Sequence, residues 1–311
     1  MHKLTINRAR LELTLRPVTP LLVKSGDKGA QLLHPERPNM MCVRTKHASL
    51  GETVYVPGSS LKGVVRSASE RVLRSLGLSC CDPMDHKSRC HDEASRRGDE
   101  LARRGGESPH PMSEIHKMVC FACRTFGSQA LASRTVFADA YPTEATKEHA
   151  NDTETRNGVS IDRKKGGPVP GSLFEFEVVV GGDFRTSVHL ANFELWQLGL
   201  LGVVLADIDE GFVRVGSAKS RGLGSMSVSI DSLVVDQIGA RGAVAGVAAL
   251  REDLVEPYGL VETTSVLGPS TEATFSPLGQ RFSWKDGNAR EALARVAELA
   301  WPALLARRGA A

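Results

Sequence analysis

Two short segments of the sequence combine glycine, hydroxyl and cationic side chains, a combination that suits binding to phosphate groups. Residues 57–66 read PGSSLKGVVR, and residues 216–224 read GSAKSRGLG. Glycine lets a backbone approach a ligand closely, and the free N–H groups at the start of a helix attract anions. The alternative interpretation is a capped surface helix for residues 57–66 and a flexible turn for residues 216–224. The candidate phosphate-binding residues are Gly58, Ser59, Ser60, Lys62, Arg66, Gly216, Ser217, Lys219, Ser220, Arg221 and Gly222.

Clustered cysteines predict a metal site. Five of the six cysteines lie within residues 80–123, with histidines among them. A set of four thiolates is typical of a closed, structural Zn²⁺ site, and reduced cysteines without a metal are the alternative. The four predicted ligands are Cys81, Cys90, Cys120 and Cys123. The substitutes are Cys80, His86, His91 and His116. Cys42 stands apart, and we expect a core or surface thiol there.

A third segment is locally basic. Residues 156–165, RNGVSIDRKK, carry four cations and one acid within the polar, glycine-rich residues 142–170. This composition predicts an extended hairpin with Arg156, Arg163 and Lys164 as candidate RNA contacts. A solvated basic loop is the alternative interpretation.

The elements that must position these residues can be read from hydrophobic periodicity. Strands are expected over residues 8–23, 135–141, 172–181 and 226–235. Helices are expected over residues 61–76, 192–207 and 289–307. Ser59 or Ser60 is the expected N-cap of the first helix, where Lys62 and Arg66 share one face. Strands separated by two helices predict an α+β domain of ferredoxin-like (RRM-like) type, whose sheet commonly serves as an RNA platform.

Composition narrows the class of protein. The chain has 311 residues, of which 41% are hydrophobic and 24% charged, as in a globular domain. No apolar run is long enough to span a membrane, and residues 1–10 have no apolar signal core, so a cytoplasmic location without membrane partners is expected. The net charge of +3 argues only weakly for nucleic acid.

In combination, the motifs resemble a known family. Residues 57–63 followed by Arg66 are similar to the signature of the RAMP superfamily, and residues 216–224 resemble its C-terminal glycine-rich loop. TRNGVSIDR at residues 155–163 and CRTFGS at residues 123–128 resemble runs found in backbone subunits of type III CRISPR effector complexes. The resemblance covers about residues 8–235.

The resemblance implies an architecture and a set of partners. It implies a palm over residues 1–238, with a zinc-binding insertion at 78–126 and a thumb β-hairpin at 149–171. Residues 239–311 form a C-terminal extension that ends in a helix. Subunits of this kind bind CRISPR RNA, stack with further copies or related RAMP subunits, contact other type III effector subunits and position the complementary target RNA.

Cleavage of the target RNA is a separate question. The resemblance places a catalytic aspartate in the long loop at residues 24–52, where Asn39 stands at or near that position. An amide cannot act as a general base. Asp27 and Glu36 are the nearest acids. We therefore expect an RNA-binding scaffold. The alternatives are an endoribonuclease that uses Mg²⁺ or Mn²⁺ to cut target RNA at six-nucleotide intervals, and a zinc-stabilised RNA-binding module outside CRISPR systems.

Overall fold

The fold is built on one antiparallel sheet. The computed structural model describes residues 3–26, 38–82, 84–85, 90–103, 111–239, 242–261, 272–276 and 279–308. The sheet has seven strands in the order β10-β11-β9-β1-β8-β4, with β5 also paired to β8. Their bounds are β1 Asn7–Pro17, β4 Thr135–Phe137, β5 Tyr141–Pro142, β8 Phe184–Ala191, β9 Met226–Ile238, β10 Glu272–Ser276 and β11 Gly279–Lys285.

The central part of the sheet is compatible with a ferredoxin-like palm. In chain order, β1 is followed by helix α2 (Gly58–Ser75), β4, β8, helix α7 (Leu195–Asp209) and β9. These four strands lie in the order β9-β1-β8-β4 and pair antiparallel, as a β-α-β-β-α-β unit requires. The α+β class predicted from the sequence is therefore confirmed. The strand expected at 135–141 is divided between β4 and β5.

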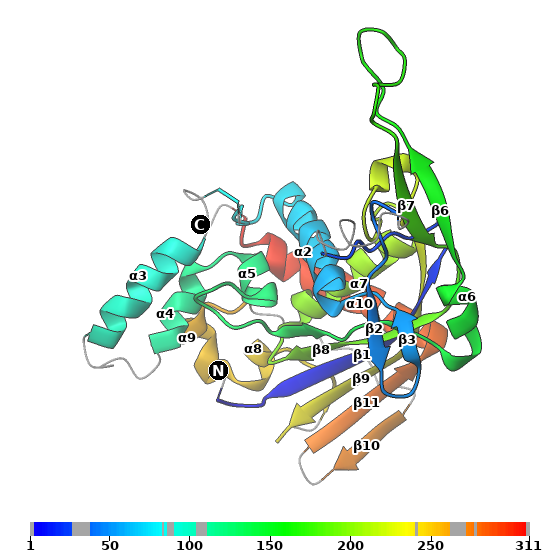
Figure 1. Cartoon of the computed structure of the whole chain (residues 1–311). Coiled ribbons are helices and arrows are strands. Elements are labelled where there is room, and N and C mark those ends of the chain that lie inside the picture. The colour runs from blue at the N-terminus through cyan, green and yellow to red at the C-terminus, as the bar shows by residue number, and fades with distance from the viewer. Residues whose placement is uncertain are drawn as a thin grey trace.

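Three helices cover one face of the sheet. Helices α2, α7 and α10 (Asp286–Leu305) lie against the covered face (Figure 1). Gly199 and Gly202 of α7 allow close packing, because a Cβ at either position would lie within 2.8 Å of α10 atoms. The C-terminal segment continues the sheet through β11 and β10, and α10 corresponds to the helix expected near its end.

The sheet face opposite these helices carries polar and charged side chains. They include Arg8, Arg10, His189 and Arg281, and none of the described outward-facing residues on β1, β8, β9 and β11 is Phe, Tyr or Trp. RRM sheets bind RNA by stacking bases on aromatic side chains. Binding of RNA to this sheet face therefore stays a prediction.

A long hairpin projects from the palm. Strand β6 (Thr153–Gly158) pairs antiparallel with β7 (Phe174–Val179), and the tip of the hairpin stands clear of the other elements (Figure 1). Its second arm is the strand expected over 172–181, so the hairpin ends later than residue 171. The base of β7 bonds to the palm through Leu21, whose N–H donates to the Val179 carbonyl at 2.8 Å.

Shorter elements surround this frame. The insertion holds α3 (Cys90–Arg103), α4 (Pro111–Met118) and α5 (Phe121–Phe126), on the opposite side of the palm from the hairpin (Figure 1). A small hairpin of β2 (Arg44–His47) and β3 (Gly51–Val54) precedes α2. Helix α6 (Lys147–Asn151) leads into β6, and α8 (Val247–Leu250) and α9 (Val255–Tyr258) follow β9.

Candidate functional site

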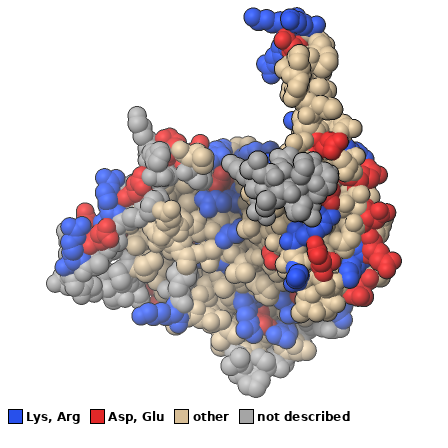
Figure 2. All heavy atoms as spheres, viewed as in Figure 1, with Lys and Arg blue, Asp and Glu red and all other residues tan. Residues whose placement is uncertain are grey.

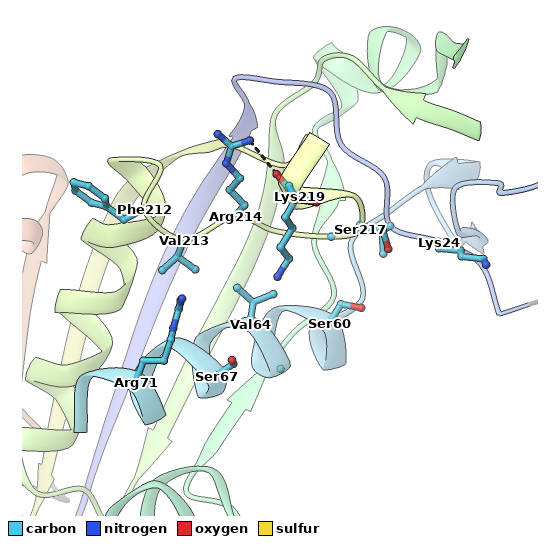
Figure 3. A pocket seen from close by; sticks show the side chains of 14 residues that line it. Lys24, Ser60, Val64, Ser67, Arg71, Phe212, Val213, Arg214, Ser217 and Lys219 are labelled. Carbon is cyan, nitrogen blue, oxygen red and sulfur yellow. Dashed lines mark hydrogen bonds between the residues drawn. The ribbon is translucent and has the colours of Figure 1, made fainter. Parts of the chain in front are cut away.

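The two candidate phosphate-binding motifs lie on opposite sides of one groove. Helix α2 contributes Ser60 and Gly63, and the glycine-rich loop between α7 and β9 contributes Gly216 and Ser217 (Figure 3). The groove has a volume of about 620 Å³. Its full lining is Val23, Lys24, Ser60, Gly63, Val64, Ser67, Arg71, Phe212, Val213, Arg214, Gly216, Ser217, Lys219 and Ser220. Segments 150 residues apart in the sequence are thus brought together, as the sequence predicted.

The glycine-rich loop is held in place by contacts that only glycine permits. Gly216 and Gly224 have positive φ angles of 83° and 81°. A Cβ on Gly216 would lie 2.5 Å from the Leu22 carbonyl oxygen, and one on Gly224 would lie 1.9 Å from the Val215 carbonyl oxygen. The Ser217 N–H also donates to the Leu22 carbonyl at 2.7 Å. The loop is therefore fixed against the chain that follows β1.

Arg221 and Gly222 lie outside the groove lining. The Arg221 guanidinium lies 5.2 Å from the centre of the Phe174 ring, at the start of β7. This cation–π contact joins the glycine-rich loop to the projecting hairpin. Gly222 has a positive φ of 90° and open space around its Cβ position. These two residues shape and anchor the loop.

Helix α2 presents a different face to the groove than the sequence indicated. Lys62 and Arg66 do share a face, but it points away from the groove. The Lys62 ammonium donates to Ser133 Oγ at 2.9 Å, and burial lowers the pKa of Lys62. Arg66 pairs with Glu70 at 2.9 Å and donates to the Gly127 carbonyl. Neither cation lines the groove, and phosphate binding by Lys62 and Arg66 stays a prediction.

The groove face of α2 is instead formed by Ser60, Gly63, Val64, Ser67 and Arg71. These positions recur at helical spacing on one stripe, because a helix turns about 100° per residue. The position of Arg71 could have been inferred from this helical spacing, because Arg71 lies on the same stripe as Ser60 and Ser67. Sequence reasoning missed Arg71, Lys24 and Arg214.

The start of α2 binds a carboxylate of the protein itself. Pro57 is the N-cap, and no serine side chain caps the helix, so the predicted Ser59 or Ser60 cap is wrong. The Gly58 N–H donates to Asp139 Oδ1 at 2.7 Å. A Cβ on Gly58 would lie 2.2 Å from the Phe137 carbonyl oxygen, which explains the glycine by packing. Ser59 is exposed and lies outside the groove lining.

The groove is strongly cationic. Lys24, Arg71, Arg214 and Lys219 line it, and none of its described lining residues is acidic. Arg71 and Lys219 form no ion pair within the described ranges. Burial lowers the pKa of Lys219, and the nearby Arg71 guanidinium lowers it further. Like charges that face each other in this way are stabilised when an anion binds between them.

Gly63 is the one groove glycine that the fold does not explain. It lies inside α2 with ordinary helical φ, and nothing lies within 4 Å of the position that its Cβ would occupy. Glycine inside a helix costs about 1 kcal/mol relative to alanine. Neither backbone geometry nor packing compensates for this cost. The position of the missing Cβ is therefore open to the groove.

The four predicted cysteines do form a cluster. The sulfur atoms of Cys81, Cys90, Cys120 and Cys123 all lie within 4.8 Å of one another. Cys81 Sγ lies 3.6 Å from both Cys120 Sγ and Cys123 Sγ. Tetrahedral coordination with bonds of about 2.3 Å separates sulfurs by about 3.8 Å. The spacing thus fits a metal such as zinc.

The other candidate ligands have different roles. His116 Nδ1 bonds to the Tyr258 carbonyl at 2.8 Å, and its Nε2 lies 2.8 Å from an Arg134 nitrogen. Cys80 adjoins the cluster but is not part of the group of four. Cys42 is buried in the core, and burial raises its thiol pKa to about 12. His86 and the His91 side chain lie outside the described residues.

Comparison with known families identifies the fold. A family-level match to the RAMP superfamily spans residues 14–227, from β1 to β9. The chain belongs to the RAMP superfamily. RAMP proteins are RNA-binding components of CRISPR-associated complexes. No curated protein matched the chain. In the described ranges, no helix has both the length and the apolar character needed to cross a membrane.

The loop expected to carry catalysis in this RAMP protein is only partly described. Asp27 and Glu36 lie outside the described residues. Asn39 is exposed, and its Oδ1 accepts the Glu175 N–H at 2.8 Å. Next to it, the Glu177 N–H donates to the Met40 carbonyl at 2.8 Å. Asn39 therefore links the loop to β7 through a structural hydrogen bond that its amide oxygen accepts.

The β6–β7 hairpin of this RAMP protein carries charge at its tip. Arg163, Lys164 and Lys165 are exposed there, where Figure 2 shows a group of basic side chains. Asp162 Oδ1 shapes the turn by accepting the N–H groups of Lys164 and Lys165 at 2.7 and 3.0 Å. Arg156, on the stem, pairs with Glu154 at 3.0 Å.

Exposed apolar side chains on the same hairpin were missed by the sequence analysis. Val159, Ile161 and Leu173 are 45%, 55% and 68% exposed. Their alternation with polar residues near the tip was the available signal. An apolar group beside cations suits contact with stacked bases and phosphates.

Proposed function

We propose that this chain is a backbone subunit of a type III CRISPR effector complex and that it holds CRISPR RNA in the groove between α2 and the glycine-rich loop. One observation carries the proposal: both RAMP motifs line a groove with four cations and no described carboxylate. RNA binding is the function of the superfamily, and this groove supplies the charge that a phosphate backbone requires.

The groove residues divide into two roles. Arg71, Lys219 and Arg214 neutralise phosphates, while the Ser60 and Ser67 hydroxyls can donate to phosphate oxygens. Gly63 lets the RNA backbone approach the helix closely. Contacts of these kinds carry no base information, so the subunit binds any guide sequence.

In the proposed complex, the β6–β7 hairpin is the thumb. Ile161, Val159 and Leu173 provide an apolar wedge between base steps, and Arg163 and Lys164 contact the adjacent phosphates. The wedge gives the guide–target duplex a regular register. Further copies of the chain, or related RAMP subunits, stack along the CRISPR RNA so that each thumb spaces the next segment, with other type III effector subunits at the ends.

The cysteine cluster is proposed to hold one Zn²⁺ ion. Four thiolates give a closed coordination sphere, which is typical of structural sites. Cys81 follows α2, Cys90 begins α3, Cys120 is the N-cap of α5, and Cys123 lies within α5. A metal would thus fasten the insertion to the palm and stabilise the fold without taking part in chemistry.

We propose a scaffold and assign no cleavage step. The Asn39 side chain accepts a hydrogen bond from the backbone of β7. The test is to incubate the assembled complex with complementary RNA and Mg²⁺ or Mn²⁺. The proposal predicts intact target RNA. Regular cuts that are lost in an Asp27→Ala variant would overturn it in favour of the endoribonuclease.

Assembly is tested by co-expressing the chain with a CRISPR array and its partner subunits. We expect copurified CRISPR RNA and a filament whose length follows that of the RNA. An Arg71→Ala, Lys219→Ala double variant should copurify with much less RNA. Monomers free of RNA from the unaltered chain would contradict a backbone role.

A further inference from the structure

We propose that Phe212 forms a base-stacking subsite at one end of the groove, where it binds an unpaired nucleobase of the bound RNA. The inference rests on the proposed function of the groove and extends it from the phosphates to a base. Phe212 lines the groove, and its side chain is 76% exposed.

The local backbone holds the ring outside the core. Gly211 ends α7 with a positive φ of 81°, and the Val213 N–H donates to the Asp207 carbonyl at 3.0 Å. Val213 is buried at 5% exposure. Residues 211–213 form a tight turn after α7, in which the Val213 side chain is buried and the Phe212 side chain is exposed. The ring is therefore held at a fixed place on the rim.

The neighbours of the ring identify the class of ligand. Figure 3 shows Phe212 and Arg71 toward the same end of the groove, with Lys24 and Ser60 toward the other. Arg214 and Lys219 lie between these ends on the glycine-rich loop. A nucleotide presents both an anion and a flat π-face. The cations of the groove match the anion, and the exposed aromatic ring matches the π-face. Proteins that bind single-stranded nucleic acids combine cations and aromatic rings in the same way.

A protein partner fits these surroundings less well. Interfaces between proteins have an apolar centre from which charged residues are depleted. Here a single apolar ring stands beside cations that have no described acidic partner in the groove lining. The charge favours a nucleic acid. Stacking tolerates every base, so Phe212 would fix the position of one nucleotide without reading its identity.

The test is a cycle that combines a protein variant with a change in the RNA. Binding of the whole chain is measured for a single-stranded RNA and for the same strand with abasic ribose at every position. We expect the unaltered protein to bind the abasic strand roughly 5- to 150-fold more weakly. Phe212→Ala should lower the affinity for normal RNA by the same factor, and it should not lower the affinity for the abasic strand any further. Phe212→Trp should bind normally.

Controls separate this inference from the proposed function. Val136→Ala removes another exposed apolar side chain, 61% exposed on β4, and should not affect binding. If Phe212→Ala binds normal RNA like the unaltered protein while Arg71→Ala binds weakly, the stacking subsite is refuted and the phosphate groove stands. If neither variant changes binding, both proposals fail. A change of oligomeric state without a change in RNA affinity would assign the ring to a protein interface and refute the subsite.

Discussion

Replacing Gly63 by alanine should separate the stability of α2 from the function of the groove. Inside a helix, alanine is about 1 kcal/mol more favourable than glycine. Nothing lies within 4 Å of the added methyl group, so no clash offsets this gain. We therefore expect Gly63→Ala to raise the free energy of unfolding by about 1 kcal/mol and the Tm by about 2 °C.

The same methyl group should weaken RNA binding. It would point into the groove between α2 and the glycine-rich loop. Because that loop is fixed on the other side, an RNA backbone in contact with the helix could not shift away from the added methyl group. Forcing an extra methyl into a packed contact costs about 1–3 kcal/mol, which corresponds to roughly 5- to 150-fold in affinity. The variant would be more stable and less functional.

The assay pairs thermal unfolding with the dissociation constant for single-stranded RNA. Gly287→Ala is the matched control, because Gly287 lies in α10, outside the groove lining, and also has open space around its Cβ position. The control should gain stability and keep its affinity. If Gly63→Ala binds RNA as tightly as the unaltered chain, the explanation of this glycine by a close ligand is refuted.

Three further predictions concern the metal, the hairpin base and the loop. Cys123→Ser should lose about one Zn²⁺ per chain and melt earlier, whereas Cys80→Ser keeps the metal, as metal analysis and thermal melting would show. Glu177 is buried, but hydrogen bonds from Arg44 and Thr153 outweigh burial and hold its pKa below the usual value. Its stabilising contribution is therefore present above the ordinary glutamate pKa and lost as pH falls through the lowered one. Urea unfolding from pH 7 to 3 should show a shallower pH dependence for Glu177→Gln than for the unaltered chain. Gly222→Ala should lower the free energy of unfolding by about 1–2 kcal/mol because of its positive φ alone. Gly224→Ala should lower it by more, because the added Cβ must also displace the Val215 carbonyl.

Much of the frame was predictable because it depends on local pattern. The alternating burial of β1 and the continuous apolar run of α7 can each be recognised from consecutive residues. The cysteine set was also predictable, since a two-residue spacing on a turn brings Cys120 and Cys123 together. The meeting of the two motifs followed from a resemblance that covers both of them.

The features that were missed depend on residues distant in sequence. Helical periodicity shows that Lys62 and Arg66 share a face, but contacts with Ser133 and Gly127 decide that this face is turned away from the groove. The group that binds the start of α2 is Asp139, which follows 81 residues later. No local preference for serine at a helix start could reveal it.

Strand pairing was missed for the same reason. The pattern over residues 172–181 identifies a strand but not its partner, which is β6. The role of Asn39 likewise became visible only when its amide oxygen was placed against the Glu175 N–H. A polar loop residue offers no sequence signal that distinguishes a catalytic position from a backbone contact.

The salt dependence of RNA binding tests the central claim most directly. The affinity for single-stranded RNA is measured from 50 to 300 mM salt for the unaltered chain, for an Arg71→Ala, Lys219→Ala variant, and for an Arg185→Ala, Arg295→Ala variant that removes two exposed cations outside the groove. Each lost phosphate contact should lower the slope of log affinity against log salt by about 0.7. The groove variant should therefore lose about 1.4 from the slope, and the control should lose none. Equal slopes for the two variants would contradict RNA binding in this groove.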